Sequence, residues 1–513
     1  MNERNQYSLL RSSLSVSLVM LLAKFVSYGR DLLLAHTLGA TELSDAFLLS
    51  TSLLLTITTF FNAPFAAAYL PLATDAYYKR DEEGKARFFG SVYGAALVLG
   101  LILLALIAVL LKPLLPFLVP GFSANARGIL QTMMLIQLPV MVIALLNCVN
   151  NGNLKLLGQF GVSELSSSII AFITILYLLF WHNSISAEGL SLSVVAAYGS
   201  AFLLGYVVIY RAGLRYQWSF RFKGNQDLKE IFTSMLPFML ASGAKELNTL
   251  IDRMVASLLT PGSITIQTYA SKLTVTEVGL IATAISLVIY AKIAKDNTLQ
   301  DLDSMRQTVV TGLTFVNTLM FPCCIFTIVF RTEIISFLFG HGAFTAEDVR
   351  LTANTMMIYA VGMIGAGIED ILTRTMHATK YRKYPALVST ISVFANTILN
   401  LLLYKPFGVY GLAAASSFVF LLKIPFYAVY VQKHIIAIRR EDRLLEQTAA
   451  IFAVSLLAGA GGYGAKTALA LVTVDPLIIL CAGGVVGGMI FLIGGLLVHN
   501  EYVTMAFNRF RKR

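Results

Sequence analysis

Residues 91–111 read SVYGAALVLGLILLALIAVLL and contain no charged side chain. A helix needs about 20 apolar residues to cross the roughly 30 Å of hydrocarbon in a bilayer, so this run predicts a membrane-spanning helix. Basic residues border the run, with Lys85 and Arg87 before it and Lys112 directly after it. The stretch therefore indicates an integral membrane protein.

The composition of the whole chain agrees with this stretch. Of its 513 residues, 57% are hydrophobic and 13% are charged, and the mean hydropathy is +0.73. Soluble domains carry about 25% charged residues. Disordered, fibrous and disulfide-rich secreted chains are excluded by the same values. The net charge of +11 is attributed to the positive-inside rule and to anionic lipid, because no basic stretch carries the interleaved aromatic residues of a nucleic-acid site.

Stretches like the first one recur along the chain. We predict an all-α integral membrane protein with about fourteen transmembrane helices, joined by connections too short to hold a soluble domain. The approximate centres of the predicted spans are Met20, Leu55, Leu101, Pro139, Ile170, Ala201, Leu240, Ile281, Asn317, Met363, Val393, Phe418, Leu457 and Met489.

The basic residues predict the orientation of the chain. With the N-terminus placed in the cytoplasm, most loop Lys and Arg residues fall in the inner loops. The outer loops then hold only Lys112, Arg127, Arg331, Arg350 and Lys405. Both termini are therefore expected to be cytoplasmic, and the first apolar run is read as an uncleaved span because it ends without a small-x-small cleavage site.

An internal repeat predicts how the helices are grouped. One copy contains Arg30-Asp31, Thr37-Leu38-Gly39 and Asp45-Ala46-Phe47, and the other contains Asp252-Arg253, Leu259-Thr260-Pro261-Gly262 and Tyr269-Ala270. Each copy ends an odd-numbered helix that starts inside, which favours two six-helix lobes related by a parallel pseudo-two-fold axis. The predicted divisions are residues 1–222 and 223–444 for the lobes, and 445–513 for an extra helix pair with a basic tail.

Charged residues inside the spans are the main functional signal. Each central Lys or Arg costs about 2.5–3.5 kcal/mol on insertion scales. Lys423 and Lys466 are expected to snorkel to the interface, whereas five other cations cluster on the first, seventh and eighth helices: Lys24, Arg30, Lys245, Arg253 and Lys272.

The clustered cations have acidic neighbours along the chain. Arg30-Asp31, Lys245-Glu246 and Asp252-Arg253 allow structural ion pairs. Adjacent residues on a helix do not face each other, however, so each charge is expected to need another partner. This predicts a water-filled cationic cavity suited to a phosphate or diphosphate group.

Two further patterns leave alternatives open. Asn248/Asp252 and Asn396/Asn400 are spaced i, i+4, so their oxygens suit a site for Na⁺ or a proton, and interhelical hydrogen bonding is the other interpretation. The stretch Leu457–Leu497 is rich in glycine, which suits close helix packing or a groove for a lipid tail.

Signals for catalysis are missing from the sequence. No Walker loop, dinucleotide fingerprint, metal-binding His/Glu pair or nucleophile elbow occurs. The four cysteines lie in apolar runs without a disulfide or metal spacing. A transporter without catalytic residues, metal or cofactor is expected, driven by a Na⁺ or H⁺ gradient, the membrane potential or substrate supply.

A set of short motifs carries a family resemblance. The motifs are Tyr28-Gly29-Arg30-Asp31, Leu38-Gly39-Ala40, Asp45-Ala46-Phe47, Pro64-Phe65, Tyr69-Leu70-Pro71, Pro120-Gly121-Phe122, Tyr269-Ala270-Ser271-Lys272-Leu273 and Phe339-Gly340-His341-Gly342-Ala343-Phe344-Thr345. In this order they resemble the MurJ/MviN family of lipid II flippases, within the multidrug/oligosaccharidyl-lipid/polysaccharide exporter superfamily.

The resemblance implies a flippase of the bacterial cytoplasmic membrane. Such a protein moves an undecaprenyl-diphosphate-linked saccharide to the outer leaflet by alternating access, and its last two helices form a groove for the lipid tail. Arg30, Asp31 and Asp45 match family positions, whereas Lys24 and Lys272 stand where the family usually has Arg. Lys24, Arg30 and Lys272 would hold the diphosphate, and Asp45 would close the outward gate or pair with these cations. Cell-wall or polysaccharide synthesis enzymes are the expected protein partners.

Other functions remain open at this level. A relative that carries an O-antigen or exopolysaccharide precursor would show the same cationic spans. A gradient-driven multidrug exporter would need an acidic cavity and twelve spans. A scaffold for a glycan synthase would need no transport of its own.

Overall fold

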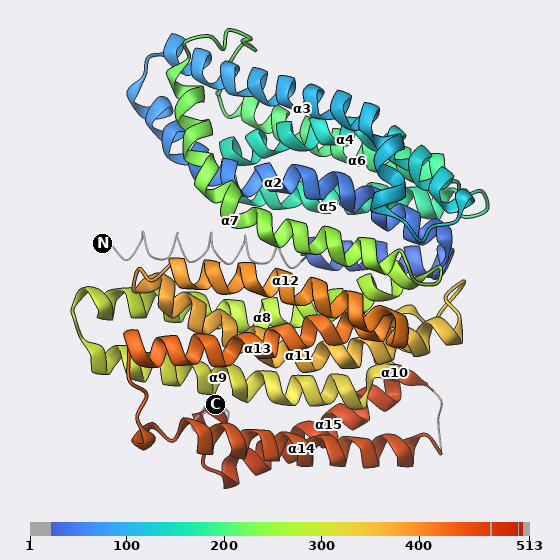
Figure 1. Ribbon diagram of the computed structural model, residues 1–513, viewed down its shortest axis with the longest axis vertical. Coiled ribbons are helices and arrows are strands. Elements are labelled where there is room, and N and C mark those ends of the chain that lie inside the picture. The colour runs from blue at the N-terminus through green and yellow to red at the C-terminus, as the bar shows by residue number, and fades with distance from the viewer. Residues whose placement is uncertain (1–21, 472–474, 501, 506–513) are drawn as a thin grey trace. The chain divides into compact units, whose positions relative to one another are not determined.

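A computed structural model describes residues 22–471, 475–500 and 502–505 of the chain. The described residues form helices and contain no strand. A first helix covers residues 22–38, and Figure 1 labels the α-helices that follow it. They are α2 (Glu42–Lys79), α3 (Glu82–Leu118), α4 (Ala124–Leu156), α5 (Phe160–Phe180), α6 (Ala187–Arg211), α7 (Gln226–Ala256), α8 (Ser263–Thr298), α9 (Leu302–Val329), α10 (Arg331–Phe339), α11 (Ala346–Ala378), α12 (Lys383–Phe407), α13 (Val409–His434), the 3₁₀ turn η1 (Arg440–Asp442), α14 (Leu444–Leu469) and α15 (Pro476–Leu497).

The all-helical membrane architecture is confirmed. Twelve helices of the described chain are long and apolar enough to cross a membrane. Met20, the predicted centre of the first span, lies outside the described residues, and every other predicted centre falls in a long helix. The helix α7 carries Lys245, Glu246, Asp252 and Arg253, and it is not among the twelve. The short helix α10 was not predicted, because its stretch was read as part of an outer loop.

Local sequence signals explain where many helices begin. Thr41 caps α2, and its hydroxyl and the Ser44 side chain bond each other's backbone N–H groups in a capping box. Thr345 and Asp348 form the same arrangement at the start of α11. These side chains satisfy N–H groups that have no partner within the helix.

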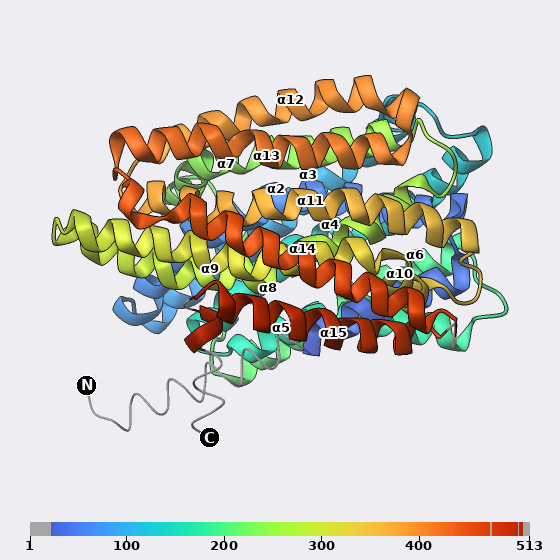
Figure 2. The same ribbon diagram turned by 90° about the horizontal axis from the view of Figure 1, so that it is seen from below.

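The chain divides into two compact units, the first ending at Thr265 and the second beginning at Ile266. This differs from the expected division after residue 222, because α7 packs along α2 and so belongs to the first unit. The helices α14 and α15, expected as a separate region from residue 445, belong to the second unit. They pack against each other, and α14 also packs against α9, as Figure 2 shows.

A buried polar cluster joins three helices of the first unit. Tyr69 of α2 donates a 2.5 Å hydrogen bond to Oδ1 of Asn153 on α4. The hydroxyl of Tyr93, on α3, donates to Oδ1 of Asn150 and accepts from Asn153 at 3.2 Å. All four residues are at most 1% exposed. Because a broken bond would leave a buried polar group unpaired, the cluster specifies how α2, α3 and α4 pack.

The C-terminal end of α9 and the residues just after it contact the last two helices, α14 and α15. The Phe330 ring, 1% exposed, lies against Gly462 of α14 and Gly483 of α15, and a methyl group on Gly483 would come within 2.3 Å of it. Lys466 pairs with Glu333 at 2.8 Å and donates to the carbonyl of Val329 at 3.0 Å. A carboxylate and a free helix-end carbonyl thus hold the Lys466 ammonium group near the end of α14, and snorkelling of this lysine to the interface stays a prediction.

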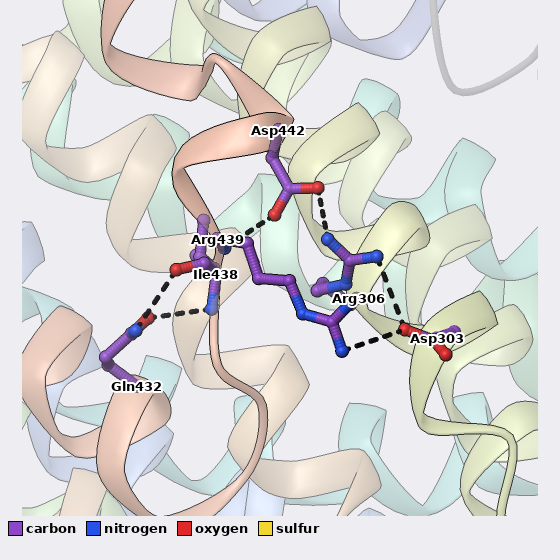
Figure 3. A network of polar contacts seen from close by, with 6 residues as sticks. All are labelled: Asp303, Arg306, Gln432, Ile438, Arg439 and Asp442. Atoms are coloured by element: carbon purple, nitrogen blue, oxygen red, sulfur yellow. Dashed lines mark hydrogen bonds and ion pairs between the residues drawn. The ribbon is translucent and has the colours of Figure 1, made fainter.

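A second polar network holds the segment that leads into α14 (Figure 3). Arg306 of α9 pairs with Asp442 and, at 3.3 Å, with Asp303. Asp442 also accepts from the backbone N–H of Arg439 at 2.7 Å. Gln432 of α13 bonds both backbone groups of Ile438, at 2.9 and 3.1 Å. The linker is thus fixed to α9 and α13, so both ends of α14 are tied to the second unit.

Candidate functional site

Arg30 and Asp31 form an ion pair on the first helix. The Nη2 and Nε atoms of Arg30 lie 2.8 and 3.1 Å from Oδ1 of Asp31, whose side chain is 3% exposed. This is the structural ion pair that the sequence allowed as one interpretation. Their Cβ atoms point in different directions, but the long arginine stem bends around the helix to reach the short buried carboxylate. The Arg30 side chain remains 25% exposed.

Asp45 receives hydrogen bonds from the start of α8 and the turn before it. Its Oδ2 accepts from the backbone N–H of Gly262 at 2.7 Å. Its Oδ1 accepts from the N–H and the hydroxyl of Thr265, at 2.8 and 2.6 Å. Asp45 is 2% exposed. Its carboxylate binds the N–H groups at the start of α8 as an anion binds the N-terminus of a helix. The expected pairing of Asp45 with a cation is not among its hydrogen bonds or ion pairs in the described chain.

The loop before α4 packs closely on the end of α7, beside the turn that Asp45 holds. A Cβ atom on Gly121 would lie 2.2 Å from the carbonyl oxygen of Ser257 and 2.5 Å from Cα of Leu258. Nearby, Glu42 accepts from the Ser123 hydroxyl at 3.1 Å. Only glycine permits this approach of the two backbones.

We expect Gly121→Ala to destabilise the first unit by about 1–3 kcal/mol, since the added methyl group collides with backbone atoms that cannot rotate away. Gly128→Ala is the matched control, because a Cβ on Gly128 meets nothing within 4 Å. The midpoint of thermal unfolding in detergent measures the difference. Equal midpoints for the two variants would contradict the close packing of this loop.

The other predicted cations differ in their surroundings. Lys24, on the first helix, is exposed and makes no hydrogen bond or ion pair with the described residues. Arg253 is partly buried on α7; it makes no hydrogen bond or close ion pair with the described residues, and its nearest acids are Asp252 and Glu246. Lys245 lies in α7, but its side chain is outside the described part of the chain. Lys272 is partly buried on α8 in the second unit.

In each of the two polar pairs considered for a cation, one residue donates a hydrogen bond to the other along the same helix. Asn248 donates to Asp252 at 3.1 Å on α7. On α12, Asn400 donates to Asn396 at 2.9 Å, and Asn396 donates to Ser416 of α13 at 3.4 Å. The first pair belongs to the first unit and the second pair to the second unit. No cluster of three or more His, Cys, Asp or Glu side chains suited to a metal occurs among the described residues.

The glycines of the last helix pair serve mainly in packing. A Cβ on Gly461 would come within 2.1 Å of Ile490, and one on Gly494 within 2.7 Å of Val454. Gly464 and Gly488, by contrast, would meet nothing within 4 Å. Close helix contact therefore explains several of these glycines, while the two open ones lie on outer faces of the pair.

Arg374 of α11 is a candidate that the sequence reasoning missed. Its Nε donates to the Ser286 hydroxyl at 2.9 Å and lies 3.4 Å from Oδ1 of Asp370. Ser286, on α8, in turn donates to Asp370. The terminal nitrogens of Arg374 make no hydrogen bond with the described residues. The described side chains therefore hold only the Nε edge of this guanidinium group. The i, i+4 spacing of Asp370 and Arg374 was the available signal.

Lys423 of α13, predicted to snorkel, pairs with Glu369 of α11 at 2.5 Å. The two side chains are 12% and 16% exposed. The carboxylate stabilises the ammonium group inside the bundle, so the lysine has no need to reach the interface. The prediction that Lys423 snorkels is therefore wrong.

The long apolar helices, with charged residues in their spans, define a multi-pass membrane transporter. Residues 34–481 match the family profile described as lipid II flippase MurJ. Because this match covers most of the chain, the protein belongs to the lipid II flippase MurJ family.

Similar proteins include curated bacterial relatives. The chain is 24% identical over 418 residues to a probable lipid II flippase MurJ of Buchnera aphidicola subsp. Schizaphis graminum, covering 80% of each protein. It is 26% identical over 421 residues to the probable lipid II flippase MurJ of Thermotoga maritima, covering 80% of this chain and 83% of the relative. These relatives support a multi-pass protein of the bacterial inner membrane.

Solved structures share the fold. A structure of lipid II flippase MurJ in an inward closed conformation matches with a TM-score of 0.79 at 21% identity, covering 95% of this chain and 99% of that one. An inward-facing multidrug transporter of the MATE family, in the MOP superfamily, matches with a TM-score of 0.66 at 12% identity, covering 82% of this chain and 95% of that one. At these identities the likeness shows the fold alone.

Proposed function

We propose that this protein is a flippase that moves lipid II from the inner to the outer leaflet of the bacterial inner membrane by alternating access. The observation that carries the proposal is the family match over residues 34–481, to which the curated relatives add the name lipid II flippase. A drug exporter or an exopolysaccharide flippase is less well supported, since none of these relatives bears such a name.

The chemistry of the charged residues supports the same proposal. A diphosphate carries negative charge that guanidinium groups bind through paired N–H donors, and ammonium groups bind as point charges. Arg30, Lys24 and Lys272 are proposed to hold the diphosphate, with Arg253 and Lys245 as weaker contributors. Asp31 would orient Arg30, because it already binds one edge of the guanidinium.

Asp45 is proposed to keep the outer side closed. Its three hydrogen bonds connect α2 to the start of α8, and the basic-residue pattern predicts that this end of the helices lies outside. The bonds would break when the outer side opens and form again when it closes. In this scheme both termini are cytoplasmic, and coupling uses the membrane potential, Na⁺ or protons. The polar pairs Asn248/Asp252 and Asn396/Asn400 remain proposed cation ligands.

The test is transport by the purified protein in liposomes. Fluorescent lipid II is placed in both leaflets, and an impermeant quencher measures how much reaches the outer leaflet. We expect protein-dependent exchange of lipid II that exceeds exchange of a phospholipid with the same dye. Exchange of another polyprenyl-diphosphate oligosaccharide, without exchange of lipid II, would favour the exopolysaccharide alternative. Co-purification with cell-wall synthesis enzymes would test the proposed partners.

Arg374→Ala is expected to slow lipid II exchange about tenfold if its guanidinium donates to the phosphates, since hydrogen bonds to charged groups contribute about 1.5–3 kcal/mol. Arg374→Lys should recover only part of the rate, because an ammonium group lacks the planar fork. Arg350→Ala, which removes an exposed arginine near the start of the same helix, is the control. An unchanged rate for Arg374→Ala would assign the residue a purely structural role.

A further inference from the structure

Glu277 lies in the apolar helix α8, and its carboxyl group has no cationic partner among the residues that the structure describes. The side chain is partly buried, and its helix is one of the candidate membrane spans. It accepts a hydrogen bond from the hydroxyl of Thr327 on α9, at a long 3.5 Å. The thiol of Cys323, one turn earlier on α9, lies beside the same carboxyl.

Other acidic side chains of the second unit have a cation or closer hydrogen-bond donors beside them. Glu369 pairs with Lys423 at 2.5 Å, Asp370 with Arg374 at 3.4 Å, and Glu333 with Lys466 at 2.8 Å. Asp296, near the end of α8, accepts from the hydroxyls of Ser304 and Thr308, at 3.0 and 3.3 Å. Glu277 differs from all of these, because among the described residues only a hydroxyl at 3.5 Å and a thiol lie against its carboxyl.

The cations on the neighbouring elements are held elsewhere. Arg306, near the start of α9, binds Asp303 and Asp442. Arg331, just after α9, donates to Asn354 and to the carbonyl of Ile328. On α11, which also packs against α8, the mid-helix charges are the already paired Glu369, Asp370 and Arg374. Lys272 precedes Glu277 by five residues on α8 and therefore points to a different side of the helix.

An ionised carboxylate in this setting is unfavourable. Burying a charge without a partner in an apolar environment costs so much free energy that the group takes up a proton instead. A cation such as Na⁺ prefers several oxygen ligands, whereas this site offers one carboxyl group, one distant hydroxyl and a thiol. The chemistry therefore favours a proton as the ligand.

We infer that Glu277 is a proton-binding site in the second unit that couples lipid transport to proton movement. The inference rests on the proposed flippase function. The carboxylate takes a proton from water on one side of the membrane and forms the neutral acid. It returns the proton to water on the other side after the conformation changes. No bond of the lipid substrate is made or broken.

The test compares wild type with Glu277→Gln, which imitates the protonated acid in shape and charge. Both proteins are reconstituted in liposomes, and lipid II exchange is measured between pH 5.5 and 8.5 (about three units, a wide range for a carboxyl group in an apolar site) and with a pH gradient of either sign. We expect the wild-type rate to change at least about fivefold with pH, and the variant's rate to be independent of pH. Glu347→Gln, which removes an exposed acid paired with Arg350, should keep the wild-type profile.

A readout independent of transport accompanies this assay. The infrared difference spectrum between acidic and basic pH should contain a protonated-carboxyl band that Glu277→Gln removes and Glu347→Gln retains. Glu277→Asp should shift the pH profile without abolishing it. Identical pH profiles for wild type and Glu277→Gln, or retention of the band in that variant, would overturn the proton site. Failure of the wild-type protein to exchange lipid II at any pH would instead count against the proposed function, and the infrared band would still test proton binding.

Discussion

Replacement of Arg30 by alanine is expected to abolish lipid II exchange while the protein is still made in normal amounts. The side chain is 25% exposed, so its guanidinium is accessible to a ligand although it pairs with Asp31. Removing it takes away the one arginine among the three residues proposed to hold the diphosphate, and lysine cannot reproduce the planar fork. Arg30→Lys should therefore retain only a small part of the rate.

The ion pair requires a second variant, because loss of Arg30 leaves Asp31 as a buried charge. Breaking a buried pair by removing one partner costs about 3–5 kcal/mol. The double variant Arg30→Ala/Asp31→Asn removes both charges and should fold better than Arg30→Ala. It should remain inactive if Arg30 binds the substrate. Recovery of lipid II exchange in the double variant would show that Arg30 serves only to neutralise Asp31.

Replacement of Asp45 by alanine is expected to reduce transport strongly by releasing the start of α8 from α2. The carboxylate accepts from two backbone N–H groups and one hydroxyl, at 2.6–2.8 Å. Hydrogen bonds to a charged group contribute about 1.5–3 kcal/mol each. A net loss of about 3 kcal/mol would shift the proposed closed-to-open equilibrium roughly 100-fold. Asp45→Asn should have a smaller effect, since it keeps one acceptor oxygen.

The opening of this contact can be measured directly. Thr260→Cys is introduced in a background in which the four native cysteines are replaced, and labelling by an impermeant maleimide is followed from outside. We expect faster labelling with Asp45→Ala. Glu42→Ala is the matched control, because this acid lies one turn earlier and, among the described residues, accepts only from Ser123 and Asn125, at 3.1 and 3.4 Å. Equal labelling rates in both variants would contradict a closing role for Asp45.

Much of the fold could be predicted from the sequence because the bilayer imposes simple rules. Runs such as residues 91–111 must form helices, since a backbone in hydrocarbon has to satisfy its own hydrogen bonds. The group of charged residues on the first, seventh and eighth helices was likewise visible as an exception to apolar composition. Composition alone could not place α7 in the first unit, because that depends on which helix it packs against.

The contact partners of the charged residues could not be predicted from the sequence. Lys423 was expected at the interface, yet it pairs with Glu369 of α11 inside the bundle. Asp45 meets Gly262 and Thr265, more than 200 positions away. Arg374 drew no attention because its orientation depends on Ser286 of another helix. Such contacts arise only when helices distant in the chain come together.

Hydropathy and charge along the chain were sufficient to determine a helical membrane protein, the approximate position of its helices and the residues that carry charge into the membrane. Each of these properties is local, because a window of about 20 residues decides whether a segment enters the bilayer. Tertiary packing alone decided which charges are neutralised by a residue of another helix, such as Lys423 by Glu369 and Lys466 by Glu333, and which have no opposite charge beside them among the described residues, such as Glu277. The physical reason is that the free energy of a charge in a low-dielectric medium depends on the atoms within a few ångströms, and the sequence does not list those neighbours.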